Sequence, residues 1–336
     1  MTDTSARLCD TVLSTRVRLA RNIDSLPFPV RLNALQKQEL NMGICRILTE
    51  CDSRLQVIAM NSLYPYEAIS LAERHLISPE FASVSEGRVL LLDEEEKVSI
   101  MLCERDHIRI QGFSEGLDPL GAYNEALKYE GILGSRLHFA FDSKLGYLNQ
   151  NPKDIGTGMR ASVLMHLPAL SRTGAMEKLS ATALKLGFVI RGSYGDGASV
   201  KGDIFRISNI VTMGITEEEA LGNLKSIALQ IATKERSAAE KLISDINIRD
   251  RINRSAGLIR NAVLLSSDEM MELLSWVRLG AIYGVIDADA ALISRLFVTM
   301  QPATVNVLAG QKLPDSARDE IRAKTVKQIF RDTQNT

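Results

Sequence analysis

Residues 88–113, RVLLLDEEEKVSIMLCERDHIRIQGF, contain three short β-rich runs. The acidic residues 93–96 separate the first two runs as a turn would, and short strands joined by turns predict an antiparallel meander. Within this segment, Met101–Ile110 alternates apolar and charged residues, which is the two-residue period of an extended strand. Successive side chains of a strand point to opposite faces, so Glu104 and Asp106 are expected on one face. The other face would carry Cys103, Arg105, His107 and Arg109.

Other segments predict the helices and strands around this meander. Apolar residues at helical spacing indicate an amphipathic helix over residues 32–51. Thr216 and Glu219 have the spacing of a capping box, at the start of a helical pattern that runs to about residue 246. The remaining expectations are a helix over 119–131, a strand over 136–142, a glycine-led segment that turns helical over 156–170, and two strands joined by a glycine-rich loop over 187–209.

These elements predict an α+β fold, in which an antiparallel β-sheet flanked by helices is followed by an all-helical C-terminal domain. Residues 250–330 are helical in pattern and have little strand signal. We therefore place a domain boundary near residue 245, which divides the chain into domains of residues 1–245 and 246–336.

Composition narrows the class of protein. The 336 residues carry a net charge of −1, and 45% are hydrophobic and 24% charged, the balance of a globular protein. That charge argues against a general nucleic-acid or membrane-surface binder. The N-terminal residues lack a signal-peptide profile, and the four cysteines form no CxxC pair, so no zinc site or disulfide framework is indicated. We expect a reduced, cytoplasmic protein.

Five arginines recur beside predicted strands and glycine turns. A guanidinium is always charged, and its planar fork of donors suits phosphate oxygens. Common nucleotide motifs such as GxxxxGK[ST] are absent, so converging arginines would have to bind a polyphosphate themselves. Most arginines in proteins are solvent-exposed surface residues. Spacing alone therefore leaves open whether these five bind an anion or are ordinary surface charges. The five are Arg16, Arg18, Arg109, Arg160 and Arg191.

Five sequence blocks together resemble a known family. They are STRVRLARNIDSLPFP (14–29), DHIRIQGF (106–113), GTGMRASVLMHLPAL (156–170), IRGSYGDG (190–197) and GDIFRISN (202–209). They are similar to the signature blocks of the ATP:guanidino phosphotransferases, the phosphagen kinase family, and within it to bacterial protein-arginine kinases. The resemblance implies transfer of the γ-phosphoryl group of ATP, with Mg, to arginine side chains of proteins. It also implies marking for a Clp protease in the stress response, a homodimer, and a partner that activates the enzyme.

The resemblance also implies sites. The element RDEIRA (318–323) is similar to one that forms an allosteric phosphoarginine pocket in protein-arginine kinases, which would use Arg318, Asp319 and Arg322. Taken alone, this element would be an exposed helix face. Matching motif positions place the nucleotide contacts on Ser14, Thr15, Arg16, Val17, Arg18, His75, Arg109, Arg160, Ala161, Ser162, Val163, Leu164, Arg191, Gly192, Ser193, Tyr194, Gly195 and Asp196.

The acceptor side departs from the family pattern. A guanidinium is a poor nucleophile until a carboxylate orients it and takes a proton. The family's NEEDH block supplies that carboxylate from its second Glu, but CERDH places Arg105 there. Asp196 replaces a second family Glu, and Asn151 replaces a reactive Cys. Arg105 and Lys153 would repel an incoming guanidinium.

Two functions therefore remain open. The chain is a protein-arginine kinase that uses Asp196, with Glu104 or Asp106 as base if the strand is bulged. Alternatively, it is an impaired pseudokinase that binds nucleotide or phosphoarginine and acts as a regulatory partner.

Overall fold

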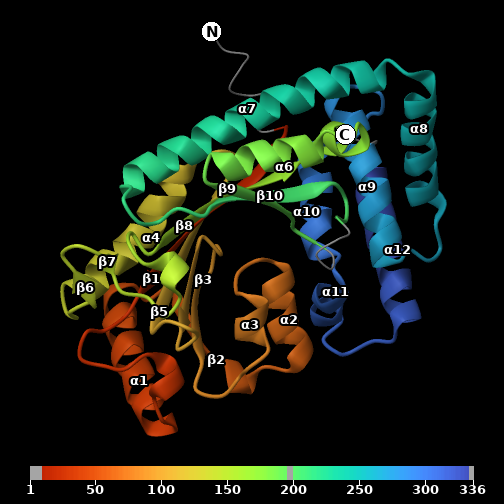
Figure 1. The fold of residues 1–336 in the computed structure, drawn as a ribbon. Coiled ribbons are helices and arrows are strands. Elements are labelled where there is room, and N and C mark those ends of the chain that lie inside the picture. Colours follow the sequence, from red (N-terminus) through yellow and green to blue (C-terminus); the bar gives the residue numbers. More distant parts are fainter. Residues whose placement is uncertain (1–9, 195–199, 333–336) are drawn as a thin grey trace.

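The computed structural model describes residues 10–194 and 200–332. In this part of the chain an eight-stranded sheet has the order β2-β3-β4-β5-β1-β8-β10-β9, and every neighbouring pair is antiparallel (Figure 1). The antiparallel meander is confirmed as β3, β4 and β5. The sheet strands are β1 (Val12–Arg21), β2 (Leu55–Ala59), β3 (Val89–Asp93), β4 (Val98–Leu102), β5 (Ile108–Glu115), β8 (Met159–His166), β9 (Phe188–Gly192) and β10 (Ile204–Asn209).

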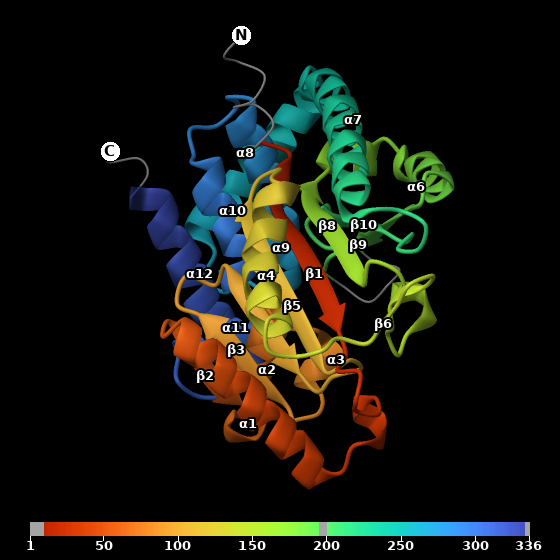
Figure 2. The ribbon, with the colours of Figure 1, turned by 90° about the vertical axis from the view of Figure 1, so that its left-hand side faces the viewer.

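Helices pack on both faces of this sheet, with α4 and α7 on one face and α2 and α3 against β3 and β4 on the other. In Figure 2, α4 lies across β1 and β5, and in Figure 1, α7 runs above β8, β9 and β10. The core between these layers is apolar, and the α7 capping box of Thr216 and Glu219 is confirmed. The helices of this region are α1 (Ala34–Cys51), α2 (Pro65–Glu73), α3 (Pro79–Ala82), α4 (Pro119–Gly134), α5 (Pro168–Arg172), α6 (Met176–Lys185) and α7 (Glu217–Ile243).

The remainder of the described chain is helical, as expected, so the fold class is confirmed. These helices pack against the sheet: Leu164 and Ile204 share a hydrophobic core with Met271 and Phe297. Glu73 of α2 accepts hydrogen bonds from the first amides of α11, which ties the two regions together. No helix in the described ranges combines the length and apolar character needed to span a bilayer. The C-terminal helices are α8 (Ile246–Asn261), α9 (Ser267–Ile282), α10 (Ala290–Thr299), α11 (Pro302–Leu308) and α12 (Asp315–Asp332).

Two sequence predictions fail in the middle of the chain. The segment 156–170 was expected to turn helical after its glycines, but residues 159–166 form β8. The C-terminal half of this strand is buried on both faces, against α7 on one face and against the core of Met271 and Phe297 on the other, so its apolar run is ambiguous between helix and strand. The strand expected over 136–142 reduces to an isolated bridge at Phe139 and the two-residue β6 (Phe141–Asp142), which pairs with β7 (Gly146–Tyr147).

The segment Met101–Ile110 is also not one strand. β4 ends at Leu102, β5 begins at Ile108, and the residues between form a hairpin loop. Cys103 has a φ of 59°, and its amide donates to the carbonyl of His107 at 2.9 Å. Strand alternation does not continue through a loop, so the predicted separation of Glu104 and Asp106 from Arg109 is wrong. Both carboxylates contact that arginine.

Gly112 permits the close approach of α4 to β5. A Cβ at this position would lie 2.1 Å from the carbonyl oxygen of Ala122 and 2.9 Å from the amide of Ala126. These are backbone atoms of a packed helix and cannot rotate away. We expect Gly112→Ala to lower the free energy of unfolding by about 3 kcal/mol through overpacking.

Gly43→Ala is the matched control for this substitution. Gly43 lies inside α1, and a Cβ there meets nothing within 4 Å. Alanine should stabilise this helix by about 0.5–1 kcal/mol because it lowers the backbone entropy lost on folding. The urea midpoints of the two variants should move in opposite directions. An unchanged midpoint for Gly112→Ala would show that α4 does not pack as described.

Candidate active site

The face of the sheet away from α4 and α7 carries arginines on five adjacent strands. In the strand register Arg18 lies opposite Arg160, and Arg206 lies opposite Arg191. Residues two apart on a strand share a face, so alternation places the remaining ones on the same side. In the described part of the chain, the arginines of this face are Arg16, Arg18, Arg109, Arg160, Arg191 and Arg206.

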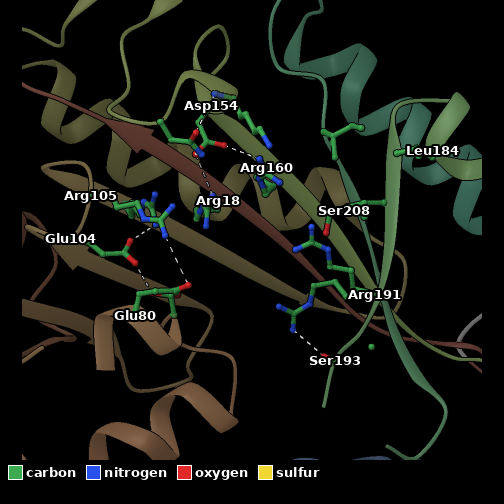
Figure 3. A pocket seen from close by; sticks show the side chains of 18 residues that line it. Arg18, Glu80, Glu104, Arg105, Asp154, Arg160, Leu184, Arg191, Ser193 and Ser208 are labelled. Atoms are coloured by element: carbon green, nitrogen blue, oxygen red, sulfur yellow. Dashed lines mark hydrogen bonds and ion pairs between the residues drawn. The ribbon is translucent and has the colours of Figure 1, made fainter. Parts of the chain in front are cut away.

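All of these arginines except Arg16 border a cavity of about 780 Å³ (Figure 3). Among its described lining residues, seven cationic side chains face three carboxylates. The excess of positive charge suits a highly charged anion such as a nucleotide triphosphate. The charged lining residues are Arg18, Arg105, Arg109, Lys153, Arg160, Arg191 and Arg206, with Glu80, Glu104 and Asp154.

Burial and mutual repulsion destabilise the charged forms of these arginines. The pKa of Arg16 is lowered well below its ordinary value by burial and by the neighbouring Arg206 and Arg18. Burial, with repulsion from Arg109, lowers the pKa of Arg18 to about 10. The Nε atoms of Arg16, Arg18 and Arg160 are buried and have no hydrogen-bond partner within the described residues. Buried donors without acceptors are expected where a ligand supplies the acceptors.

One carboxylate stands at the end of this arginine face. Glu104, in the β4–β5 loop, forms an ion pair with Arg109 and accepts a hydrogen bond of 2.6 Å from the Ser78 hydroxyl. Both carboxylates are buried, and Asp106 accepts hydrogen bonds from the Asn22 side chain at 2.9 Å and from the Gln150 amide at 3.1 Å. Of the two, only Glu104 lines the cavity.

Arg105 does not lie beside Arg109 as strand alternation predicted. Its side chain is 51% exposed, and its Nη2 lies 4.0 Å from Oε1 of Glu80. It reaches the cavity at the mouth (Figure 3). Solvent screens a charge in such a position. The predicted repulsion of an incoming guanidinium by Arg105 is therefore weaker than a buried arginine would produce.

A short turn forms another part of the wall. The Asn151 side chain donates to Oδ2 of Asp154 at 3.1 Å, and Arg160 donates to Oδ1 of the same carboxylate at 2.8 Å. The nearby cations lower the pKa of Asp154 although burial raises it. Lys153 lies in the same turn and also lines the cavity. Asn151 thus positions the turn through Asp154.

The structure divides the predicted nucleotide contacts into two groups. Thr15, Val17, Ala161 and Val163 are buried on the opposite face of the sheet, and their side chains cannot reach the cavity. His75 lies 3.3 Å from the Ser193 hydroxyl and its ring is 4.9 Å from that of Tyr194. Gly195 and Asp196 lie outside the described residues. The predicted residues on the cavity side of the sheet are Ser14, Arg16, Arg18, Arg109, Arg160, Ser162, Leu164, Arg191, Gly192 and Ser193.

Sequence analysis missed Arg206, Ser208 and Asp154. Arg206 lines the cavity and donates to the Ser193 hydroxyl at 3.3 Å. Its signal was present in residues 204–208, IFRIS, where Arg206 and Ser208 alternate with Phe205 and Ile207 and therefore share a face.

The prediction of an exposed RDEIRA helix face is wrong at Arg322. This side chain is 1% exposed and donates to the backbone carbonyls of Met300 and Leu265, each at 2.8 Å. It also pairs with Asp319 at 2.6 Å. Arg318 donates to the carbonyl of Leu313 and pairs with an aspartate. Both guanidinium groups therefore bind the protein itself.

Two protein-family models match this chain. Residues 38–238 match the family model "ATP:guanido phosphotransferase, C-terminal catalytic domain", and residues 245–336 match "Protein-arginine kinase McsB C-terminal domain". The first match spans more than half of the chain, and the chain belongs to the ATP:guanido phosphotransferase family.

Its relatives narrow the group. A protein-arginine kinase of Halothermothrix orenii is 41% identical over 322 residues, which cover 95% of this chain and 92% of that protein. A protein-arginine kinase of Clostridium tetani is 34% identical over 333 residues and 98% of each chain. The relationship is with protein-arginine kinases along nearly the whole length.

Solved structures support the fold. The duplicated taurocyamine kinase from Schistosoma mansoni has a TM-score of 0.61 and 24% identity, over 70% of this chain and 34% of that one. A lombricine kinase has a TM-score of 0.59 and 22% identity, over 68% and 67% of the two chains.

Proposed function

We propose that the chain transfers the γ-phosphoryl group of ATP to arginine side chains of proteins. One observation carries the proposal: a cavity whose floor is an arginine face has a carboxylate, Glu104, at its edge. A polyphosphate needs positive charge around it and a guanidinium acceptor needs negative charge, and the arginines and Glu104 of this cavity supply the two. Because the relatives are named protein-arginine kinase, we propose that the acceptor is an arginine side chain of a protein.

The arginines supply binding and charge stabilisation. Phosphoryl transfer passes through a loose transition state whose charge is spread over phosphate oxygens, so fixed cations around those oxygens lower the barrier. Arg18 and Arg160, paired across two strands, lie at the centre of the face. No cluster of three metal-ligating side chains occurs in the described ranges, so magnesium would enter coordinated by ATP and water.

Glu104 is the group we assign to the acceptor. It orients the arginine guanidinium and takes one proton as the new N–P bond forms, while the bond from the γ-phosphorus to the ADP oxygen breaks. The Ser78 hydrogen bond and the Arg109 ion pair fix its orientation. Asp196, outside the described residues, remains a candidate for the second carboxylate.

The family resemblance also suggests the cellular location, the oligomeric state and the partners of this protein. We propose a cytoplasmic homodimer that responds to stress, works with an activator protein, and marks proteins for Clp-type degradation. The helical region of residues 246–336 would serve dimerisation and phosphoarginine sensing. Because Arg322 binds two carbonyls, phosphoarginine would have to displace those contacts.

Acid-labile phosphate incorporation into an unfolded protein tests this function. With Mg and ATP, we expect incorporation above background that depends on enzyme concentration. Calorimetry with ATP is the companion measurement. ATP binding without incorporation would refute the kinase and support a second candidate, a nucleotide-binding regulatory partner. That candidate is motivated by the neutral Asn151 and the cationic Lys153 on the acceptor side.

Arg105→Glu separates these two functions. Since Arg105 is half-exposed and 4.0 Å from Glu80, reversing its charge should raise kcat/KM for a protein acceptor only about threefold. Steady-state kinetics at low and high salt check this value, and the gain should shrink with salt. A gain of about 100-fold would instead show that Arg105 impairs the wild-type chain.

A further inference from the structure

Five large apolar side chains remain exposed beside the acceptor side of the cavity. Ile210 has its amide 2.9 Å from the carbonyl of Gly187, and a Cβ at Gly187 would lie 3.1 Å from Val211, so the segments that carry them are adjacent. Single exposed leucines are ordinary, whereas a contiguous apolar patch marks a binding surface. This apolar shelf consists of Leu184 and Leu186 (each 58% exposed), Ile210 (37%), Val211 (43%) and Met213 (50%).

The shelf begins inside the active-site cavity. Leu184 and Ile210 line that cavity together with the arginines, and Figure 3 shows Leu184 near Ser208. The next residues are joined to the acceptor-side turn. The Thr212 hydroxyl donates to the carbonyl of Lys153 at 3.0 Å and to that of Ile155 at 2.7 Å. Leu184 and Ile210 therefore belong to both the shelf and the cavity, and Thr212 fixes the segment that carries Val211 and Met213 against the acceptor-side turn.

The shelf ends in a second groove. This groove, of about 350 Å³, is lined by Met213, by the exposed Phe141 and Leu145, and by the charged residues Lys144, Glu217 and Glu219. An extended chain that leaves the cavity along the shelf would therefore meet further apolar contacts. That order suits a polypeptide with apolar residues beside an arginine.

We propose that the apolar shelf binds the polypeptide that flanks the acceptor arginine. The inference rests on the proposed function and adds the kind of substrate: an unfolded segment whose arginine has apolar neighbours. A small guanidino compound would fill only the cavity, where Lys153 and Arg105 oppose its charge. Apolar burial along the shelf supplies attraction that offsets this repulsion. In a folded substrate, the apolar neighbours of an arginine are largely buried and cannot reach the shelf.

Two peptides of equal length test this substrate preference. Each carries one arginine, flanked by leucines in one peptide and by serines in the other. For the wild-type chain we expect kcat/KM to be about tenfold higher for the leucine peptide. In the double variant Val211→Ser, Met213→Ser this ratio should fall to about two, because both substituted side chains lie on the shelf and outside the arginine cavity. The control, Leu120→Ser with Val263→Ser, removes two apolar residues elsewhere that are more exposed than the shelf pair, and it should keep the ratio.

The ratio is independent of how much enzyme is folded, since an inactive fraction lowers both rates equally. A wild-type ratio near one, or an unchanged ratio in the shelf variant, would overturn the inference. If neither peptide is phosphorylated, the proposed function has failed. The shelf is then tested by the ratio of the dissociation constants of the two peptides, measured with fluorescent labels. A wild-type ratio near one, or an unchanged ratio in the shelf variant, would contradict the inference.

Discussion

Replacing Arg16 with methionine is expected to weaken ATP binding by about 100-fold and to stabilise the nucleotide-free protein. The two effects have one cause. The Arg16 guanidinium is buried, its Nε has no partner within the described residues, and Arg206, Arg18 and Arg160 repel it. Without an anion the charge is a cost to folding, and with a triphosphate it is an attractive partner.

Methionine retains an unbranched apolar side chain at this position and removes the charge. In the sheet, Arg16 lies between Phe113 and Ser162, so the aliphatic contacts can be kept. The melting temperature without nucleotide should rise by about 1–2 °C. Added ATP should then give a much smaller further increase than it gives the wild-type chain, because ligand stabilisation follows affinity.

Thermal unfolding with and without Mg-ATP, together with calorimetry, measures both effects. Arg31→Met is the matched control, since Arg31 is an exposed arginine remote from the cavity lining, and it should change neither value. A lower melting temperature combined with unchanged ATP affinity would mean that Arg16 is a structural residue and that the arginine face is not the phosphate site.

Periodicity predicted the sheet-forming segments where one face is apolar and the other polar. β10 was predicted in this way, whereas β1 was not predicted as a strand although its polar and apolar residues alternate; in both strands the alternation decides which residues reach the cavity. β8 was missed because helices bury both faces of its C-terminal half, which removes the polar half of the pattern there. The hairpin loop at 103–107 was missed for a different reason: charged residues in a loop can imitate alternation by chance.

Only some of the residues of the candidate site could be predicted from the sequence. Motif matching identified Arg18, Arg109 and Arg160, but it could not show that Asp106 is buried and Glu104 lines the cavity. That distinction depends on the positive φ of Cys103, which starts the loop. Arg322 shows the same limit, because its burial arises from backbone carbonyls distant in sequence.

Glu104→Gln is expected to lower kcat by about a thousandfold while the KM for ATP changes less than about threefold. Glutamine keeps the size of the side chain and can still accept from Ser78, but it cannot take a proton from the acceptor guanidinium. Arg109 keeps its second carboxylate, Asp106, at 3.3 Å, so the arginine face should stay in place. The loss should therefore appear in the chemical step.

Asp106→Asn is the comparison that isolates this role. Asp106 pairs with the same arginine but is fully buried and held by Asn22 and the Gln150 amide. Its replacement should lower the melting temperature more than Glu104→Gln does, because it leaves a buried network incompletely satisfied. Single-turnover phosphotransfer and thermal unfolding of both variants separate chemistry from stability. A Glu104→Gln variant that keeps kcat within tenfold of wild type would assign proton transfer to another carboxylate, and Asp196 would then be the group to test.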